Sequence, residues 1–258
     1  MSAALSDSAS RRAPASLGDP VALLAVWERV AGVPPAARGA AVIAAAGLLP
    51  SEEAALDLPI GECAALAARA QAEAFGPVVA CTLTCDSCAE LLDLELDLAG
   101  LPAPPDPVAT VSFADGELLL RAPTTRDLVD AAGADDPRRL LVERCVRERT
   151  GAGPREAAAD GVTADDGPGS GVIAAIDAAV EELAGAAGLV LCALCPGCGA
   201  DVRTDLDPGQ LLWEQVTMAA ERLVADVAAL AGAYGWTEPD VLALSPARRA
   251  AYRQLAGR

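Results

Sequence analysis

Two four-residue cysteine motifs carry the strongest chemical signal in the chain. The motifs CDSC and CPGC contain Cys85, Cys88, Cys195 and Cys198. A Cys-x-x-Cys turn directs two sulfurs toward one point about 2.3 Å from a metal, and two such turns complete the tetrahedral four-sulfur site of a structural zinc. These four cysteines are therefore the candidate ligands of one zinc ion per chain.

The sequence around the two motifs forms an internal repeat. GPVVACTLT and AELLDLELDL flank the first motif, and AGLVLCAL and GADVRTDLDP flank the second. Alternation of apolar and polar residues predicts strands, so each unit reads as strand, cysteine turn, strand. Pro196 and Gly199 suit the second turn, because proline fixes φ and glycine accepts positive φ, whereas the first motif has neither. Because 106 residues separate Cys88 from Cys195, the predicted zinc element is bipartite, with an inserted segment.

Other uses of the two motifs stay open at this point. Separate local metal sites or metal-free thiols fit the same residues. A redox-active Cys-x-x-Cys normally opens a helix, where the helix N-terminus stabilises the thiolate, but both motifs here run into strand-like segments. Disulfides are disfavoured, because the N-terminal sequence MSAALSDSASRRAPASLG has no apolar secretory region.

The four remaining cysteines are weaker candidates as ligands. Cys81 lies four residues before its motif and Cys192 three before its own, so on strands they face opposite sides. Cys63 and Cys145 fall in the helical stretches GECAALAARAQAEAFG and RRLLVERCVRER. For all four, we expect the role of a buried free cysteine that packs as a small hydrophobe. The chain has no histidine, which excludes Ser-His and Cys-His pairs. We therefore expect a protein that is not an enzyme.

Composition excludes several classes of partner. The net charge of −18 opposes a nucleic-acid backbone, so we expect no nucleic-acid partner. No apolar stretch reaches the roughly 20 residues of a membrane helix, so no membrane partner is expected, and the predicted location is the cytoplasm. GAGPRE and GPGSG lack the Lys-Ser/Thr of a phosphate-binding loop, and no small-molecule substrate is expected.

The chain divides into regions of different composition. Abundant alanine and leucine favour helix, and the predicted fold class is α+β, mainly helical, with a bipartite zinc-ribbon-like β element and a β-hairpin segment inserted between its two knuckles. The expected regions are a disordered tail (1–18), N-terminal helices (19–76), the bipartite element (77–206) with its insertion (108–149) and flexible loop (150–170), and C-terminal helices (207–258).

Local signals place the elements. Asp19-Pro20 and Asp207-Pro208 each read as a helix cap followed by a first-turn proline. Asp115-Gly116 lies between two alternating runs and predicts a hairpin. The pair Thr124 and Asp127 matches a capping box, and RRLLVERCVRER is expected to be helical throughout.

The helix predicted after Asp207 has an unusually broad apolar stripe. Leu212, Val216, Leu223 and Leu230 recur at helical spacing along it. Such a helix either lies in the core or is offered to a partner. The C-terminal region from residue 211 to 255 is the expected partner surface, with aromatic anchors and a positive edge formed by Trp213, Trp236, Arg248, Arg249, Tyr252 and Arg253.

The order of these pieces resembles the baseplate hub assembly proteins of contractile-tailed phages and of phage-tail-like contractile injection systems. The resemblance is carried by AEAFGPVVACTLTCDSCAELLDLELDL, GELLLRAPTTRDLVDAA, LLVERCV, LCPGCGADVRTDLDPGQLLWEQV and ALAGAYGWTEPDVLALSPARRAAYRQL. It spans about 70–258 and implies an assembly chaperone or accessory protein whose partners are baseplate or hub proteins. It also implies a zinc ribbon built on the two Cys-x-x-Cys motifs. A zinc-ribbon regulator and a dithiol oxidoreductase are the alternatives.

Overall fold

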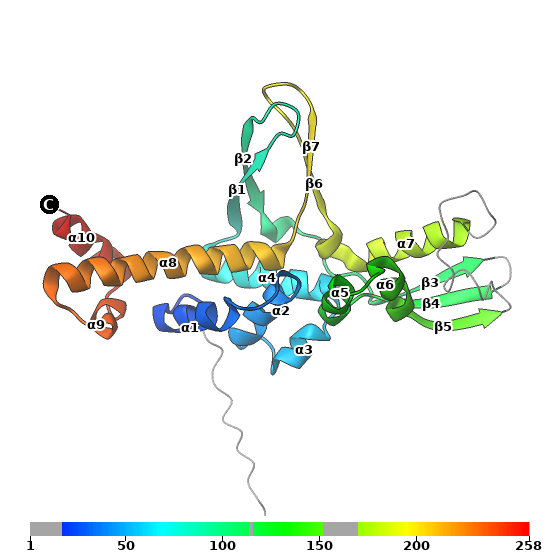
Figure 1. The fold of residues 1–258 in the computed structure, drawn as a ribbon, viewed down its shortest axis with the longest axis horizontal. Helices are drawn as coiled ribbons and strands as arrows, with labels where there is room; N and C mark the ends of the chain where they lie inside the picture. The colour runs from blue at the N-terminus through cyan, green and yellow to red at the C-terminus, as the bar shows by residue number, and fades with distance from the viewer. Residues whose placement is uncertain (1–16, 114–115, 152–169, 258) are drawn as a thin grey trace, which may run out of the picture.

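The computed structural model describes residues 17–113, 116–151 and 170–257. An elongated helical body carries a β prong near its middle, with the C-terminal helices at one end and a small sheet module at the other (Figure 1). Leu17, from the expected tail, is buried in the body. Most of the expected tail and of the expected loop (150–170) lies outside the described residues.

The body joins both ends of the sequence. It consists of α1 (Pro20–Val30), α2 (Pro35–Ala45), α3 (Glu52–Leu56), α4 (Ile60–Phe75) and the long α8 (Pro208–Tyr234). The Asp19 carboxylate accepts the N–H of Ala22 at 2.9 Å and caps α1 as the sequence predicts. Gly76, at φ 101°, ends α4.

The first half of α8 completes the core of the N-terminal helices. Leu212 and Val216 are fully buried and cluster with Val30 and Ile43. Where α2 meets α8, a Cβ added at Gly39 would lie 2.9 Å from the Cα of Gly209. This close approach requires glycine at residue 39, and it fixes the helix that emerges from the prong against the N-terminal body.

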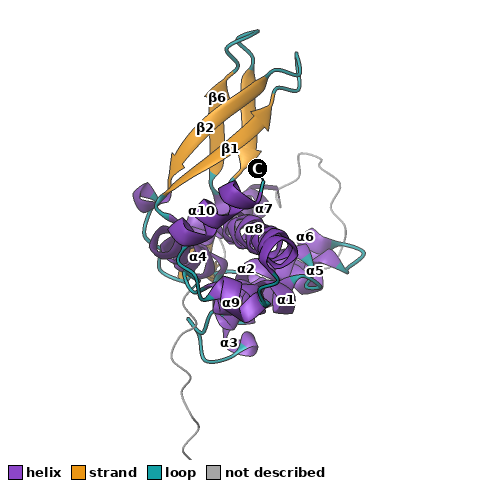
Figure 2. Ribbon diagram, turned by 90° about the vertical axis from the view of Figure 1, so that its left-hand side faces the viewer, coloured by secondary structure: helices purple, strands orange, loops and turns teal. Residues whose placement is uncertain are grey.

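The prong consists of two antiparallel hairpins that stand on the body (Figure 2). The first pairs β1 (Val78–Thr84) with β2 (Leu91–Asp97), and the second pairs β6 (Val190–Leu194) with β7 (Asp201–Asp205). Short 3-10 turns, Leu98–Gly100 and Gly185–Gly188, flank them. The strand, turn, strand repeat that the sequence predicts is therefore present, in a mixed structure of helices and small antiparallel sheets.

The segment between the hairpins folds as a module with its own core. Its sheet has the order β3-β4-β5, with β3 (Val108–Phe113), β4 (Gly116–Arg121) and β5 (Val146–Gly151). The helices are α5 (Thr125–Ala132), α6 (Pro137–Cys145) and α7 (Ser170–Ala184). Buried residues of the sheet and of α7 form one cluster, which includes Val111, Leu118, Leu120 and Ile176.

The prediction of one helix over RRLLVERCVRER is wrong. The helix ends at Cys145, and the chain continues as β5, which pairs with β4 and places Val146 opposite Leu120. The residue types favour a helix here. Pairing with β4 instead gives the backbone of this segment hydrogen-bond partners, and it lets Val146 pack against the apolar cluster of the module. The β3–β4 hairpin is confirmed, although residues 114 and 115 lie outside the described part of the chain.

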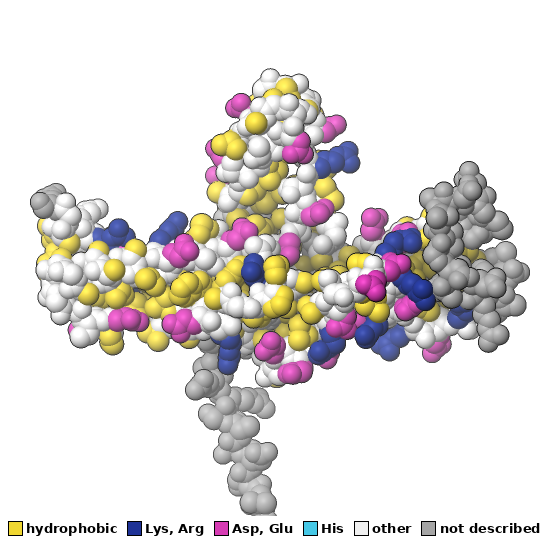
Figure 3. Space-filling model, viewed as in Figure 1, with side chains coloured by type: hydrophobic (Ala, Val, Ile, Leu, Met, Phe, Trp, Pro, Cys, Tyr) yellow, Lys and Arg dark blue, Asp and Glu magenta, His cyan; other side chains and the backbone are white. Residues whose placement is uncertain are grey.

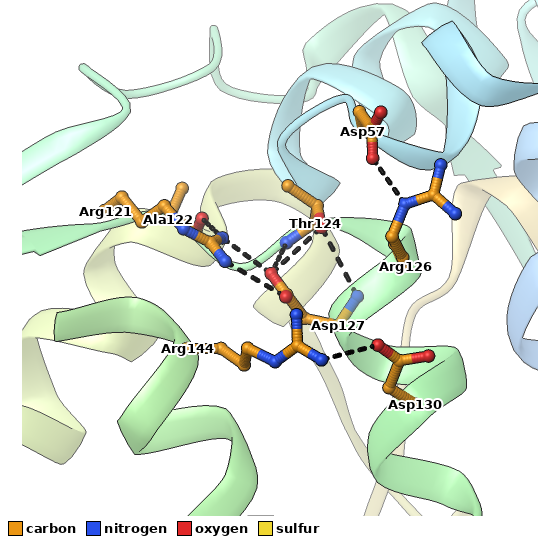
Figure 4. Close-up of polar contacts among 8 residues, drawn as sticks. All are labelled: Asp57, Arg121, Ala122, Thr124, Arg126, Asp127, Asp130 and Arg144. Carbon is orange, nitrogen blue, oxygen red and sulfur yellow. Dashed lines mark hydrogen bonds and ion pairs between the residues drawn. The ribbon is translucent and has the colours of Figure 1, made fainter. Parts of the chain in front are cut away.

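Several polar contacts lie where this module meets the body (Figure 4). The Arg121 guanidinium contacts both carboxylate oxygens of Asp127, at 2.6 and 3.0 Å, and Thr124 donates its N–H to the same carboxylate at 2.8 Å. Burial raises the pKa of Asp127, but the bonds from Arg121 and Thr124 outweigh it and hold that pKa below its usual 3.8. Arg126 reaches Asp57 of the body at 2.6 Å. The predicted capping box is therefore present, and Arg126 of the helix that it caps pairs with the body.

Candidate metal centre

The two cysteine turns lie between the strands of their hairpins and have the same backbone hydrogen bonds. In the first, Cys85 donates its N–H to the carbonyl of Glu90 at 2.9 Å and accepts the N–H of Ala89 at 2.8 Å. In the second, Cys195 donates to Ala200 at 2.9 Å and accepts the N–H of Gly199 at 2.9 Å. The repeat seen in the sequence is therefore a repeat of three-dimensional structure.

The residue after each motif adopts the left-handed conformation. Gly199 has φ 73°, as expected for glycine, and Ala89 takes the same conformation with φ 59°. A residue with a Cβ is disfavoured there by roughly 1–2 kcal/mol. The first turn therefore keeps the geometry of the second despite its different sequence, which indicates that the surrounding structure holds it in place.

The turns bring all four predicted ligand sulfurs together. The sulfurs of Cys85, Cys88, Cys195 and Cys198 lie within 4.8 Å of one another. Cys85 and Cys198 are 3.7 Å apart, and Cys88 and Cys195 are 3.6 Å apart. One metal ion can contact the four sulfurs at once, two from each hairpin.

Burial differs systematically between the two positions of each motif. The first cysteines, Cys85 and Cys195, are 2% exposed, whereas Cys88 and Cys198 are exposed. The buried pair clusters with Leu92 and Val202 from the two hairpins. This cluster is small, so the sulfur site and a few apolar side chains together hold the hairpins to each other.

Because the sulfurs lie close together, the pKa values of their thiols differ from one another. Backbone N–H groups at Ser87 and Cys88, with help from the neighbouring thiols, lower the pKa of Cys85 to about 7. The N–H of Glu90 lowers the pKa of Cys88, but the thiols of Cys198 and Cys195 and burial outweigh it and raise that pKa to about 12. Cys85 therefore loses its proton more readily than Cys88, and a cation bound between them would favour the thiolate form of both.

The other four cysteines lie outside this cluster. Cys63 and Cys145 are buried, and burial raises the pKa of each thiol to about 11. They pack as small hydrophobes, as expected. Cys81 is half-buried on β1 and Cys192 is exposed on β6, which agrees with the prediction that the two face opposite sides. The expectation that Cys192 is a buried small hydrophobe is wrong, because its side of β6 faces solvent.

The expected partner-binding residues divide between the surface and the interior. Trp213 is buried in the core of the body, and Arg249 is 5% exposed. Arg249 donates to the carbonyl of Leu244 at 2.8 Å, and its Nε lies 3.5 Å from an Asp226 carboxylate oxygen. Both side chains thus contribute to packing inside the protein, and their part in binding a partner stays a prediction.

Of the remaining four expected residues, Trp236 lies between α8 and α9 (Glu238–Leu242), and the other three lie in α10 (Pro246–Ala256), at the outer end of α8. Trp236 stacks on Tyr234 at a centroid distance of 4.8 Å and meets Tyr252 edge to face at 4.9 Å. Arg248 is exposed, and the exposed Arg253 pairs with Asp226 at 2.7 Å. On the face shown in Figure 3, hydrophobic side chains gather along the outer part of α8.

Comparison of the chain with protein-family models, with curated proteins and with solved structures finds no match. Within the described residues, no helix combines the length and the apolar character that crossing a bilayer requires.

Proposed function

We propose that the four-cysteine cluster holds one structural zinc ion. Four sulfurs at 2.3 Å from a tetrahedral zinc lie about 3.8 Å apart. Two of the four inter-hairpin sulfur pairs are 3.7 and 3.6 Å apart, and all four sulfurs lie within 4.8 Å of one another. All four positions are filled by protein thiols, which is the pattern of a structural site rather than of a catalytic one. The ion replaces the core that two short hairpins lack.

We further propose that the protein is an assembly chaperone or accessory protein for the baseplate hub of a contractile tail or a related injection system. The observation that carries the proposal is the prong: two segments more than 100 residues apart close one four-sulfur site and project from a helical body. A metal ion in such a site would hold the two hairpins together and so stabilise the surface that the prong presents to a partner. The order of motifs from about 70 to 258, which resembles that of baseplate hub assembly proteins, supports this class of partner.

Co-purification with purified hub subunits tests this proposal. The wild-type protein is expected to bind a hub subunit, and Cys195→Ser is expected to lose both the metal and most of the binding. Cys192→Ser, which changes an exposed cysteine outside the cluster, is the matched control and should retain both. If no hub subunit binds the metal-loaded wild-type protein, the assembly role is wrong.

A dithiol oxidoreductase is the second candidate, favoured by the pKa of Cys85 near 7. The hydrogen bonds of Cys85 with Cys198 and of Cys88 with Cys195 connect different hairpins, however, and neither motif opens a helix. We expect insulin reduction no faster than with free dithiol. Turnover above that level would favour the oxidoreductase.

A further inference from the structure

A groove of about 430 Å³ runs between β1 and α8, beside the base of the prong. Its β1 wall consists of four consecutive residues, Val79 to Thr82. Side chains alternate between the two faces of a strand, so a cavity over one face would be lined by every second residue. Because four consecutive residues line this groove, it follows the backbone edge of β1.

Within the described residues, that edge carries backbone groups to which no strand is hydrogen-bonded. Pairing with β2 begins with the bond from the Leu98 N–H to the Pro77 carbonyl and ends with the bond from the Cys85 N–H to the Glu90 carbonyl. In an antiparallel pair the hydrogen-bonded positions alternate, so the odd-numbered residues bond to β2. Ala80 and Thr82 therefore direct their N–H and C=O groups away from β2, and within the described residues no hydrogen bond engages them.

The opposite wall is one face of α8, and it is largely apolar. Leu211, Trp213 and Met218 line it, and Met218 is 39% exposed. Thr217 also lines the groove, and its hydroxyl oxygen is buried without a hydrogen-bond partner in the described structure. The wall thus offers apolar surface to side chains of a segment that runs along β1.

The charge of the groove limits its occupant. Glu214, which accepts a hydrogen bond from Gln210 at 2.9 Å, is the charged side chain of the lining, and the chain as a whole carries −18. A segment with a basic residue opposite Glu214 is attracted, and an acidic one is repelled.

We propose that this groove binds an extended segment of the hub partner, which adds as a strand to the free edge of β1. The segment exchanges backbone hydrogen bonds with Ala80 and Thr82, directs apolar side chains toward Leu211 and Met218, and places a basic side chain near Glu214. Strand addition gives affinity through the backbone and specificity through alternate side chains. The inference rests on the proposed function, because it takes the hub subunit as the source of the segment.

The second hairpin supplies a matched control. Counting back from each cysteine turn, Val190 of β6 occupies the position of Ala80, and the bond from the Leu206 N–H to the Leu189 carbonyl corresponds to the bond between Leu98 and Pro77. Val190 therefore also directs its N–H away from its partner strand. It does not line the groove. Proline at either residue removes an outward N–H and leaves the hairpin ladder intact.

The test is the affinity of a purified hub subunit for three proteins, with metal content and melting temperature checking each fold. Ala80→Pro is expected to weaken binding at least tenfold, and Val190→Pro less than twofold. In the complex, the amides of Ala80 and Thr82 should exchange hydrogen more slowly than in the free protein. If Ala80→Pro binds as the wild type does, the inference is wrong while the assembly role stands. If the wild type binds no hub subunit, the assembly role fails and the proposed occupant fails with it.

A second pair of variants avoids the backbone. Met218→Asp places a charge in the groove, and Val21→Asp places one on α1 outside it, where Val21 is 60% exposed. Both sites are exposed, so both variants should fold. Loss of hub binding in Met218→Asp alone supports the groove, and equal binding by the two variants overturns it.

Discussion

The two hairpins of the prong differ in sequence and in setting, yet they form the same turn. The first has CDSC followed by Ala89, and the second has CPGC followed by Gly199. Both turns have the same two backbone hydrogen bonds and the same left-handed residue. Only the first borders the groove with α8, and the second leads directly into α8. The two hairpins share the geometry of their cysteine ligands, but they differ in the surface that each of them exposes.

The comparison implies that the hairpins depend on each other more than on the module between them. Each is a two-stranded sheet, which is marginal by itself in water. The module between them has its own apolar cluster and its own polar contact with the body. Three changes of decreasing effect test this division.

Removal of the metal has the largest expected effect. A chelator should accelerate amide hydrogen exchange in both hairpins together, by about 100-fold or more, which corresponds to about 3 kcal/mol. The core of α1, α2 and α8 should keep its protection, because its apolar cluster does not include the cysteine turns. Exchange mass spectrometry measures both regions at once, and acceleration of one hairpin alone would contradict their mutual dependence.

Loss of the charge of Asp127 should affect the inserted module and spare the prong. Asp127→Asn is expected to cost about 3 kcal/mol, because it leaves Arg121 without its partner. The folded pKa of Asp127 is lowered, so its contribution is complete above pH 3.8 and is lost as the pH falls through the folded value. The difference between wild type and variant should therefore shrink below about pH 4. Urea unfolding measures it, and a simultaneous loss of metal would show that prong and module are coupled.

Substitution of the residue that follows each cysteine motif has the smallest expected effect. Ala89→Gly should stabilise the first turn by about 1 kcal/mol, because it removes a Cβ from a left-handed position. Gly199→Ala should destabilise the second by a similar amount, and since no atom lies within 4 Å of the added Cβ, the cost is conformational. Competition for the metal measures both. If both substitutions changed metal affinity equally and in the same direction, the two turns would not share the same left-handed conformation in the folded protein.

The sequence predicts the elements whose signals are local. The cysteine turns, the cap at Asp19, the capping box at Thr124 and the full length of α8 all follow from residues within a few positions of one another. What it misses depends on distant contacts. β5 forms because β4 pairs with it, and Arg249 is buried because α10 packs on Asp226 of α8. The groove along β1 brings together residues more than 120 positions apart, and no short pattern indicates it.

The most direct test of the account is the zinc content of three proteins purified without added metal: the wild type, Cys195→Ser and Cys192→Ser. The four-sulfur geometry predicts one zinc per wild-type chain, little or none in Cys195→Ser, and one in Cys192→Ser, whose cysteine lies outside the cluster. A wild-type protein with almost no metal, freely titratable thiols and a melting temperature insensitive to chelator would contradict the central claim.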